Sequence, residues 1–215
     1  MVQIHETVKR CRGRPQARPD EETMRLIVEA ADHEFQSNGY AGTNIKVVAE
    51  RAGVSTKTLY KLVPTKAGLF EATIRLRISR FLLDLDDEVG EELDPREAVE
   101  RILFAFGVLT LSAETIAINR LVIGECGRFP EVARAFYQLA IVPVNGVIEA
   151  WLTQQKDKGT LRLDDVHIAS GMLRGMMIME PQRTAMMGQR AAPHRDEIAL
   201  RARQCAEVFY NGCRM

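Results

Sequence analysis

Apolar residues recur along the chain at the three- and four-residue spacing of amphipathic α-helices. Ile27, Ala31 and Phe35 form one such stripe, which begins after acidic residues at Asp20 and stops at Asn38-Gly39. No segment has the sustained two-residue alternation that is typical of half-buried strands. The pattern therefore predicts an all-α protein of about nine helices.

Capping residues indicate where several of these helices begin. Thr43, Ser55 and Thr65 are expected to cap the second, third and fourth helices, because each hydroxyl can accept a hydrogen bond from the first helical turn. The fourth helix is expected to run to about residue 89 and to link two parts of the chain. Further helices are expected to follow Asp94 and Ser112, and the last is expected over 194–210.

Prolines predict how the later helices bend and end. Pro143 is expected to kink the helix that runs from 129 to 151, because proline removes a backbone donor and its ring crowds the preceding turn. A helix capped by Asp164 or Asp165 is expected to stop at Glu180-Pro181, which leaves 182–193 as a loop.

The composition is that of a soluble globular protein, with 46% apolar and 27% charged residues. The formal net charge is zero, so total charge gives no argument for a nucleic-acid partner. The charge is uneven, however, because residues 1–66 hold 11 Lys and Arg against 8 Asp and Glu, with five of those bases between Lys9 and Arg18. We expect a flexible basic arm (1–19), a small domain (20–66) and a larger domain (67–215).

The cysteines and the N-terminus bear on compartment and cofactors. Cys11, Cys126, Cys205 and Cys213 form no CxxC pair, so we expect free thiols in a reducing compartment, with no metal and no cofactor. The N-terminus lacks the apolar stretch of a signal peptide, and no apolar run approaches the roughly 20 residues that span a bilayer. A cytoplasmic location is expected.

The segment 42–66 carries the clearest functional signal. It indicates two short helices joined by a turn at Gly53. The second is too short to be stable alone, so packing must hold it. Its outer face presents hydroxyls and amines that can contact phosphates or base edges in the major groove of DNA. These residues are Thr56, Lys57, Tyr60 and Lys61. The turn residues alone would suit any helical hairpin.

This segment resembles the helix-turn-helix of the TetR family over about residues 24–70. The family signature is matched in order and spacing by Phe35, Gly39-Tyr40, Thr43, Val48-Ala49, Ala52-Gly53-Val54-Ser55, Thr58-Leu59-Tyr60, Pro64 and Lys66-Ala67-Gly68-Leu69-Phe70. Val63 departs from it where an aromatic is common, and Leu62 departs where many relatives have a polar residue. Ala67-Gly68 replaces an acidic-apolar pair and is expected to weaken the start of the fourth helix.

The resemblance implies a homodimeric, all-helical transcriptional regulator, usually a repressor that a small ligand releases. It also implies DNA contacts from residues with hydroxyl or amine groups. Those implied are Thr43, Thr58, Tyr60 and Lys66 for phosphates, and Thr56, Lys57 and Lys61 for bases, with Ser55 as the cap beside them. Simpler roles stay open: Thr43 and Ser55 as caps alone, Tyr60 as packing, and Lys61 as a solvated helix end. The basic arm either adds DNA contacts or is a disordered tail.

The residues that would make those arm contacts are Arg12 and Arg14. Farther along, residues 120–137, Trp151 and 159–162 resemble the C-terminal domain of an AefR-like TetR subgroup. That resemblance implies a homodimer formed through the last two long helices, here about 165–179 and 194–210. Gly171 and Gly175 would let helices approach closely there, although the apolar stripes of both helices could instead be intrachain core.

The resemblance also implies a ligand pocket among the middle helices. Its candidate lining consists of large apolar side chains, for each of which a place in the core is the simpler explanation: Phe81, Leu85, Phe104, Phe106, Leu121, Phe136, Trp151 and Met177. Arg120 and Glu125 interrupt an apolar helix and are either solvent-exposed, a structural ion pair or a polar handle for the ligand. We favour the ion pair. A mostly apolar pocket predicts a hydrophobic or aromatic effector.

An enzyme is not expected. The histidines His5, His33, His167 and His194 are scattered, and no nucleophile motif or phosphate-binding loop is found. The acidic run 84–88 is expected to be a solvated face rather than a metal site. The resemblance implies a three-helix DNA-binding domain with a helical ligand-binding and dimerisation domain, which acts on double-stranded operator DNA. The alternative is a helical protein-interaction module that does not bind DNA.

Overall fold

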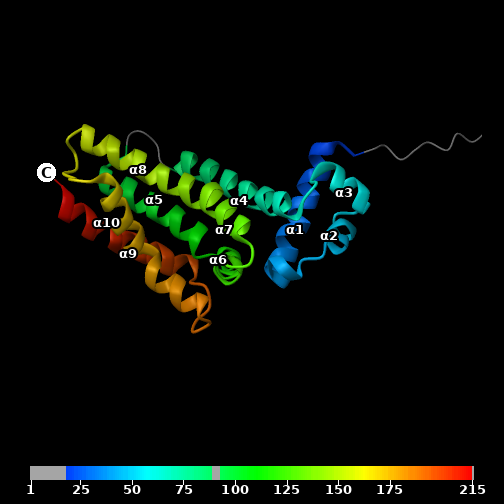
Figure 1. Cartoon of the computed structure of the whole chain (residues 1–215). Helices are drawn as coiled ribbons and strands as arrows, with labels where there is room; N and C mark the ends of the chain where they lie inside the picture. The colour runs from blue at the N-terminus through cyan, green and yellow to red at the C-terminus, as the bar shows by residue number, and fades with distance from the viewer. Residues whose placement is uncertain (1–17, 89–92, 215) are drawn as a thin grey trace, which may run out of the picture.

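The computed structural model describes residues 18–88 and 93–214, without the side chains of 84–88, and these form ten α-helices and one π-helical turn (Figure 1). In chain order the elements are α1 (Asp20–Gly42), α2 (Ile45–Arg51), α3 (Thr56–Leu62), α4 (Lys66–Glu88), α5 (Pro95–Thr110), α6 (Ala113–Glu125), α7 (Pro130–Phe136), η1 (Tyr137–Ile141), α8 (Val142–Asp157), α9 (Val166–Met186) and α10 (Arg195–Cys213). Within the described residues the expected all-α architecture is confirmed, and β-type pairing is limited to an isolated bridge between Leu161 and Arg214. Residues 1–17 of the basic arm, including Arg12 and Arg14, lie outside the described residues.

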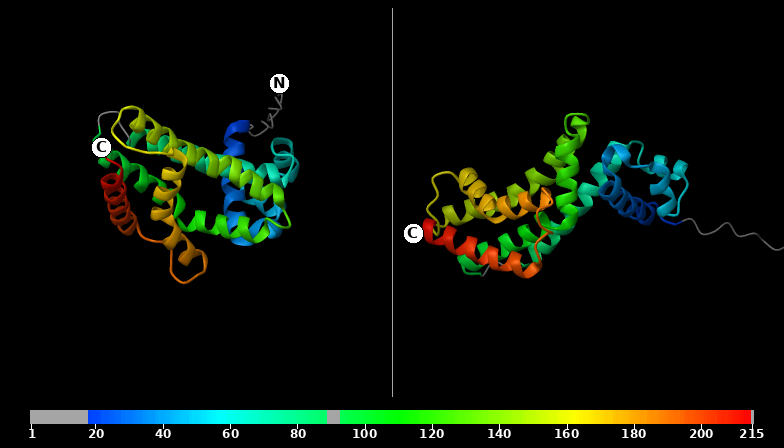
Figure 2. Two further views of the ribbon diagram at one scale, coloured as in Figure 1. Left: turned by 60° about the vertical axis from the view of Figure 1, so that its left-hand side comes forward. Right: turned by 90° about the horizontal axis from the view of Figure 1, so that it is seen from below.

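Helices α1, α2 and α3 form a small unit at the end of the molecule opposite the C-terminus (Figures 1 and 2). Ile27 and Phe35 of α1 and Leu59 of α3 are buried at its centre. Phe70 of α4 packs edge-on against Phe35, with ring centroids 5.4 Å apart. The first turns of α4 therefore belong to the core of this unit.

The long helix α4 joins the small unit to a bundle made by the remaining helices (Figure 1). Within the bundle α5 lies along α10, and the two helices meet α9 around Gly107. A Cβ at position 107 would lie 2.4 Å from Met177 Cε and 2.7 Å from Ile198 Cγ2. Helix α6 reaches back to contact α1, so the small unit is supported by α6 as well as by α4.

Most of the expected helix caps are confirmed. The side-chain oxygens of Ser55, Thr65, Asp94 and Ser112 each accept a hydrogen bond from a backbone amide in the first turn that follows. The chain also opens α4 at Lys66 despite the glycine at position 68. These starts depend on residues within one helical turn of each other, which is why the sequence predicts them.

The expected cap of α2 is wrong by one residue. Thr43 points back and donates from its hydroxyl to the carbonyl of Gly39 at 2.6 Å. Asn44 caps α2 instead, because its side-chain oxygen accepts from the amide of Lys46 at 2.9 Å. Gly39 has a φ of 69° and interrupts α1 as expected, but helical turns resume as far as Gly42.

Pro143 and Pro181 both lie inside helices, in α8 and α9. Before Pro143 the helix widens into the π-turn η1, in which the amide of Val142 donates to the carbonyl of Tyr137, five residues back. This widening relieves the crowding that the proline ring would cause in an α-helical turn. The expected stop at Pro181 is wrong, since α9 continues to Met186. Nearby, Arg201 donates to the carbonyl of Met176, which supports the backbone of α9 just before the bond that Pro181 cannot make.

The helical run from Pro130 to Asp157 is continuous and apolar. One 18-residue window within this run has a mean hydropathy of 1.3, so the run is, among single helices of the described residues, the one that would also suit a bilayer-spanning segment by length and composition. The expectation that no apolar run reaches that length is therefore wrong. In this fold the run packs against α4, α6 and α9 as one helix of the bundle.

Candidate nucleic-acid interface and effector cavity

The outer face of α3 is held in place from both ends and from beneath. Ser55 accepts a hydrogen bond from the amide of Thr58 at 3.0 Å, and its hydroxyl lies 2.9 Å from the hydroxyl of Thr58. Leu59 is buried against α1 and α2, and Val63 is buried just past the helix end. A helix of seven residues gains its stability from this packing rather than from its own propensity.

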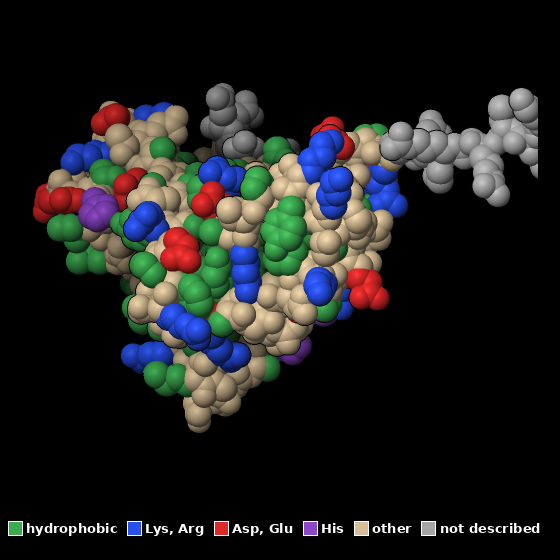
Figure 3. Space-filling view, turned by 45° about the vertical axis from the view of Figure 1, so that its right-hand side comes forward, with side chains coloured by type: hydrophobic (Ala, Val, Ile, Leu, Met, Phe, Trp, Pro, Cys, Tyr) green, Lys and Arg blue, Asp and Glu red, His purple; other side chains and the backbone are tan. Residues whose placement is uncertain are grey.

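The side chains that α3 turns outward are polar and exposed. Thr56, Lys57 and Lys61 are exposed, and Tyr60 is 48% exposed. Lys61 lies 3.7 Å from Asp20 across the surface, but both side chains are more than 70% exposed, so this ion pair holds the lysine only weakly. Figure 3 looks toward the small unit and shows lysine and arginine side chains spread over its face, with hydrophobic and acidic side chains between them. This face suits a polyanion.

A shallow surface hollow lies between the start of α2 and the outer face of α3. It is lined by Asn44, Lys46, Thr56 and Tyr60 together with the backbone before α2. Lys46 is exposed and was not among the expected contacts, although its place three residues after Thr43 puts it in the first turn of α2. The hollow therefore gathers an amide, a hydroxyl, a phenol and an ammonium group on one surface.

Two of the expected phosphate contacts are turned into the protein. Thr43 is only 6% exposed, with its hydroxyl bonded to Gly39. The ammonium of Lys66 donates to the carbonyls of Ala41, at 3.1 Å, and Thr43, at 2.8 Å, and it lies 5.2 Å from the ring centre of Tyr40. Burial lowers the pKa of Lys66, while the nearby carboxylates of α1 and α6 act in the opposite direction. Both residues shape the link between α1 and α2.

The expected ion pair between Arg120 and Glu125 does not form, because each side chain has a distant partner. Arg120 donates to the carbonyls of Ala185 and Met186 at the end of α9, where a helix leaves its carbonyls without partners. Glu125 accepts from the amide of Ala41 at 2.9 Å, which ties the end of α6 to the small unit. Arg120 therefore lies outside the cavity described next.

A cavity of about 150 Å³ lies among α4, α5, α6, α7, η1, α8 and α9. Of the expected lining residues, Phe106 and Phe136 reach it. Phe81 and Phe104 instead line an open cleft of about 600 Å³ between α1 and the bundle. The others are core or undescribed: Leu121 and Met177 are buried, Trp151 is partly buried against the core, and the side chain of Leu85 lies outside the described residues.

The polar part of the cavity lining was missed from the sequence. Arg77, Asn119, Asn145 and Arg174 line it together with Gln182. Arg174 is the one charge between Gly171 and Met179, so an isolated charge in an apolar helix was the available signal. The acidic run 84–88 has no described side chains, and no cluster of three metal-ligating side chains occurs among those that are described.

Helices α9 and α10 expose a second, apolar face. Ile168, Met172 and Met179 of α9 and Leu200 and Val208 of α10 are each more than half exposed. A Cβ added at Gly175 would meet nothing within 4 Å. Large apolar side chains exposed on two neighbouring helices are a feature of contacts between proteins.

A capped short helix with a polar outer face, supported by a helical bundle, defines a helix-turn-helix protein. Residues 27–73 match the family described as bacterial regulatory proteins, tetR family, and residues 97–212 match the AefR-like transcriptional repressor C-terminal domain. The chain belongs to the TetR family of transcriptional regulators, with an AefR-like C-terminal domain. Its relatives are regulators and not enzymes.

Individual relatives agree with this assignment. The transcriptional regulator TtgR of Pseudomonas putida is 32% identical over 108 residues, which is 49% of this chain and 51% of TtgR. The chain thus spans about half the length of the curated relatives it matches. A TetR-family structure from Mesorhizobium loti has a TM-score of 0.81 at 22% identity and covers 93% of this chain and 100% of its own. The flavonoid-responsive regulator FrrA has a TM-score of 0.69 at 22% identity, and the match covers 90% of this chain and 98% of FrrA. These structures share the fold.

Proposed function

We propose that this chain is a homodimeric DNA-binding repressor that a small ligand releases from its operator. The observation that carries the proposal is the outer face of α3, where Thr56, Lys57, Tyr60 and Lys61 are exposed while Ser55 and Leu59 hold the helix beneath them. In a helix-turn-helix protein this face enters the major groove. Lys46 on the start of α2 is added to the phosphate contacts.

The dimer proposal is supported by the apolar face of α9 and α10. Two copies that bury this face against each other would remove five large apolar side chains of each copy from water. A twofold axis there would place two α3 helices on the same side of the dimer. They need to sit one DNA turn, about 34–36 Å, apart to enter successive major grooves. A ligand that favours a different separation would release the DNA.

The ligand proposal is supported by the cavity among the middle helices, whose walls include Phe106 and Phe136. FrrA, which shares this fold, is named as flavonoid-responsive. A small, largely aromatic effector is therefore proposed for this chain as well. Such a ligand acts only if it binds one arrangement of the two domains better than the other.

The proposal is tested by DNA binding of the purified full chain to a fluorescent fragment from the region upstream of its own gene. The wild type should bind with sequence preference and with an affinity that falls steeply as salt rises. Lys57→Ala and Tyr60→Ala should weaken binding, and loss of each phosphate contact should lower the salt slope by about one unit. Lys158→Ala is the matched control, since Lys158 is an exposed lysine at the far end of α8.

The outcome decides between the two candidate functions. If the wild type shows no salt-dependent, sequence-selective binding, the repressor proposal is wrong and a protein-interaction module becomes the better explanation of the fold. If Lys158→Ala weakens binding as much as Lys57→Ala, the DNA contacts do not come from α3.

A further inference from the structure

The cavity among α4, α5, α6, α7, η1, α8 and α9 is small and has a largely apolar wall. Its volume is about 150 Å³, and Ile74, Ile78, Phe106, Phe136 and Ile178 supply much of its surface. An apolar cavity of roughly this volume in another protein holds one benzene molecule. The space therefore fits a single aromatic ring with a small substituent.

The charged groups on this wall are all cationic. Arg77 and Arg174 line the cavity, and no Asp or Glu is among its lining residues within the described part of the chain. A polar or charged group beside an apolar cavity is costly unless it is paired or hydrogen-bonded. The chemistry of the wall therefore favours a ligand that brings a negative charge.

The described hydrogen bonds of the Arg174 guanidinium go only to neutral acceptors. Its Nη1 donates to Asn145 Oδ1 at 2.7 Å, and its Nε lies 3.2 Å from both the carbonyl and the hydroxyl oxygen of Ser170. Burial lowers the pKa of its guanidinium, and the charge of Glu149 acts in the opposite direction. Glu149 itself lies 2.8 Å from His167 Nδ1, and no described carboxylate forms an ion pair with Arg174. Arg174 thus keeps capacity for an anion.

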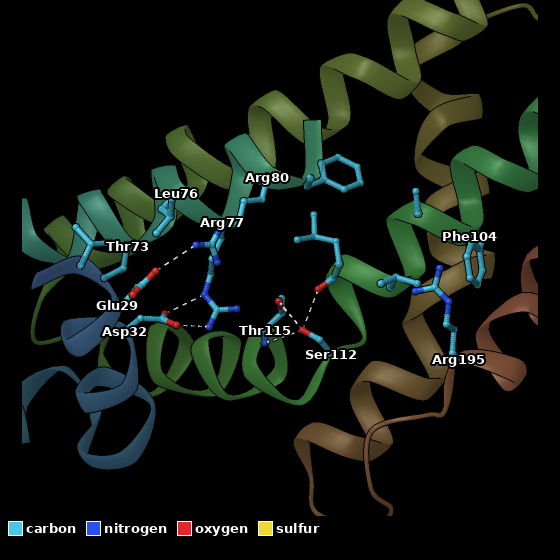
Figure 4. Close-up of a pocket in the computed structure, with 15 residues that line it drawn as sticks. Glu29, Asp32, Thr73, Leu76, Arg77, Arg80, Phe104, Ser112, Thr115 and Arg195 are labelled. Carbon is cyan, nitrogen blue, oxygen red and sulfur yellow. Dashed lines mark hydrogen bonds and ion pairs between the residues drawn. The ribbon is translucent and has the colours of Figure 1, made fainter. Parts of the chain in front are cut away.

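Arg77 connects the same cavity to the small unit. Its Nε donates to Asp32 Oδ1 at 2.9 Å and its Nη2 to Oδ2 at 2.6 Å, so α4 is tied to α1 by a two-bond ion pair (Figure 4). Both side chains are about three-quarters buried, which makes this pair stronger than the exposed one between Arg80 and Glu29 on the next turn. Arg77 lines the cavity on one side and the open cleft along α1 on the other.

We propose that the effector is a small aromatic carboxylate, whose carboxylate binds Arg174 and competes with Asp32 for Arg77. A carboxylate accepts two parallel hydrogen bonds from a guanidinium, which a neutral group of similar shape does not reproduce. When Arg77 turns from Asp32 to the ligand, α4 loses its main polar tie to α1, and the small unit moves relative to the bundle. This inference rests on the proposed function, because it names the ligand class of that same regulator.

The first test compares an acid with its neutral counterpart on the wild-type full chain by isothermal titration calorimetry, without DNA. Phenylacetate and phenylacetamide have one ring each and nearly the same shape. We expect phenylacetate to bind about tenfold tighter or more, the difference that one charged hydrogen-bonded pair gives. Equal binding of the two compounds, or no binding of either to the folded protein, would overturn the ligand class.

The second test uses variants that should act in opposite directions. Arg174→Met should remove the preference for phenylacetate, while Arg183→Met, an exposed arginine on the same helix, should keep it. Asp32→Asn frees Arg77 and should raise the affinity for phenylacetate by about threefold or more without changing that for phenylacetamide, because coupled equilibria are reciprocal. An unchanged or lowered affinity of Asp32→Asn would show that Arg77 is not shared.

DNA binding is measured separately, so the two proposals can fail independently. Phenylacetate should weaken the binding of wild type to its upstream fragment, and phenylacetamide should not. A chain that binds DNA but not phenylacetate keeps the proposed function and loses this inference. A chain that binds phenylacetate but no DNA keeps the ligand class and loses the repressor function.

Discussion

The outward face of α3 and the outward face of α9 and α10 are both open to solvent in the single chain, but they are made of opposite chemistry. The first carries hydroxyls, a phenol and ammonium groups, with Lys57 and Tyr60 at its centre. The second carries large apolar side chains such as Met172, at 65% exposed, and Leu200, at 57%. A polar face is stable in water, so its contact with a partner can be transient. An exposed apolar face favours permanent association.

The largest effect on DNA affinity is expected from a charged substitution in the apolar face of α9 and α10. Met172→Glu or Leu200→Glu would place charges in the dimer contact, and the chain should become monomeric with its fold intact. Loss of the linked second site should weaken binding to a two-half-site DNA by roughly a hundredfold or more. Sedimentation velocity gives the mass, and fluorescence anisotropy gives the affinity.

The control for this change is Ile123→Glu, which adds the same charge at an exposed isoleucine of α6. It should leave the mass and the affinity unchanged. A Leu200→Glu chain that still sediments as a dimer would show that α9 and α10 face solvent in the assembly and that another surface forms the contact.

A smaller effect is expected beneath the polar face. Leu59 is fully buried under α3, so Leu59→Ala should lower the free energy of unfolding by about 2–5 kcal/mol through lost burial and a cavity. Since α3 is held mainly by this packing, DNA binding should fall with stability although no contacting side chain changes. Chemical denaturation followed by circular dichroism measures the stability. Lys61→Ala, on the opposite face, should change it by less than about 0.5 kcal/mol.

The smallest effect is expected at the N-terminal cap of α3. Ser55→Ala removes the oxygen that accepts from the amide of Thr58 and should cost about 1 kcal/mol. Thr56→Ala, one residue on, keeps the cap and should leave the thermal midpoint nearly unchanged while it alters DNA affinity. If both changes lower the midpoint equally, the cap is not what fixes the start of α3.

The helix caps and the cavity differ in how far the sequence predicts them. The caps at Ser55, Thr65 and Asp94 involve atoms within one turn of each other, so residue type and spacing are enough. The cap at Asn44 was missed because the choice between two adjacent capping residues depends on where the hydroxyl of Thr43 finds its acceptor. Local pattern does not contain that information.

The cavity could not be predicted in the same way, because its wall comes from seven elements spread over more than 100 residues of the chain. Large apolar side chains were the obvious candidates, yet Leu121 and Met177 are simply core. The sequence does not show that Arg77 and Arg174 line one cavity, because this depends on how α4 and α9 pack around the same space. Pro181 was misjudged for a related reason, since α9 continues through it while packed against α5, α6, α8 and α10, and local pattern does not show that packing.

The π-turn η1 has a consequence for the length of the chain. A π-turn holds one residue more than the α-helical path it replaces, so removal of one residue from Tyr137–Ile141 would restore a regular helix with the flanking faces still in register. A deletion elsewhere in Pro130–Asp157 would rotate one part against the other by about 100°. This helix therefore contains one short segment in which loss of a residue would keep the flanking faces in register but would restore the crowding by the ring of Pro143, and Ala140 and Ile141 place that segment against the cavity.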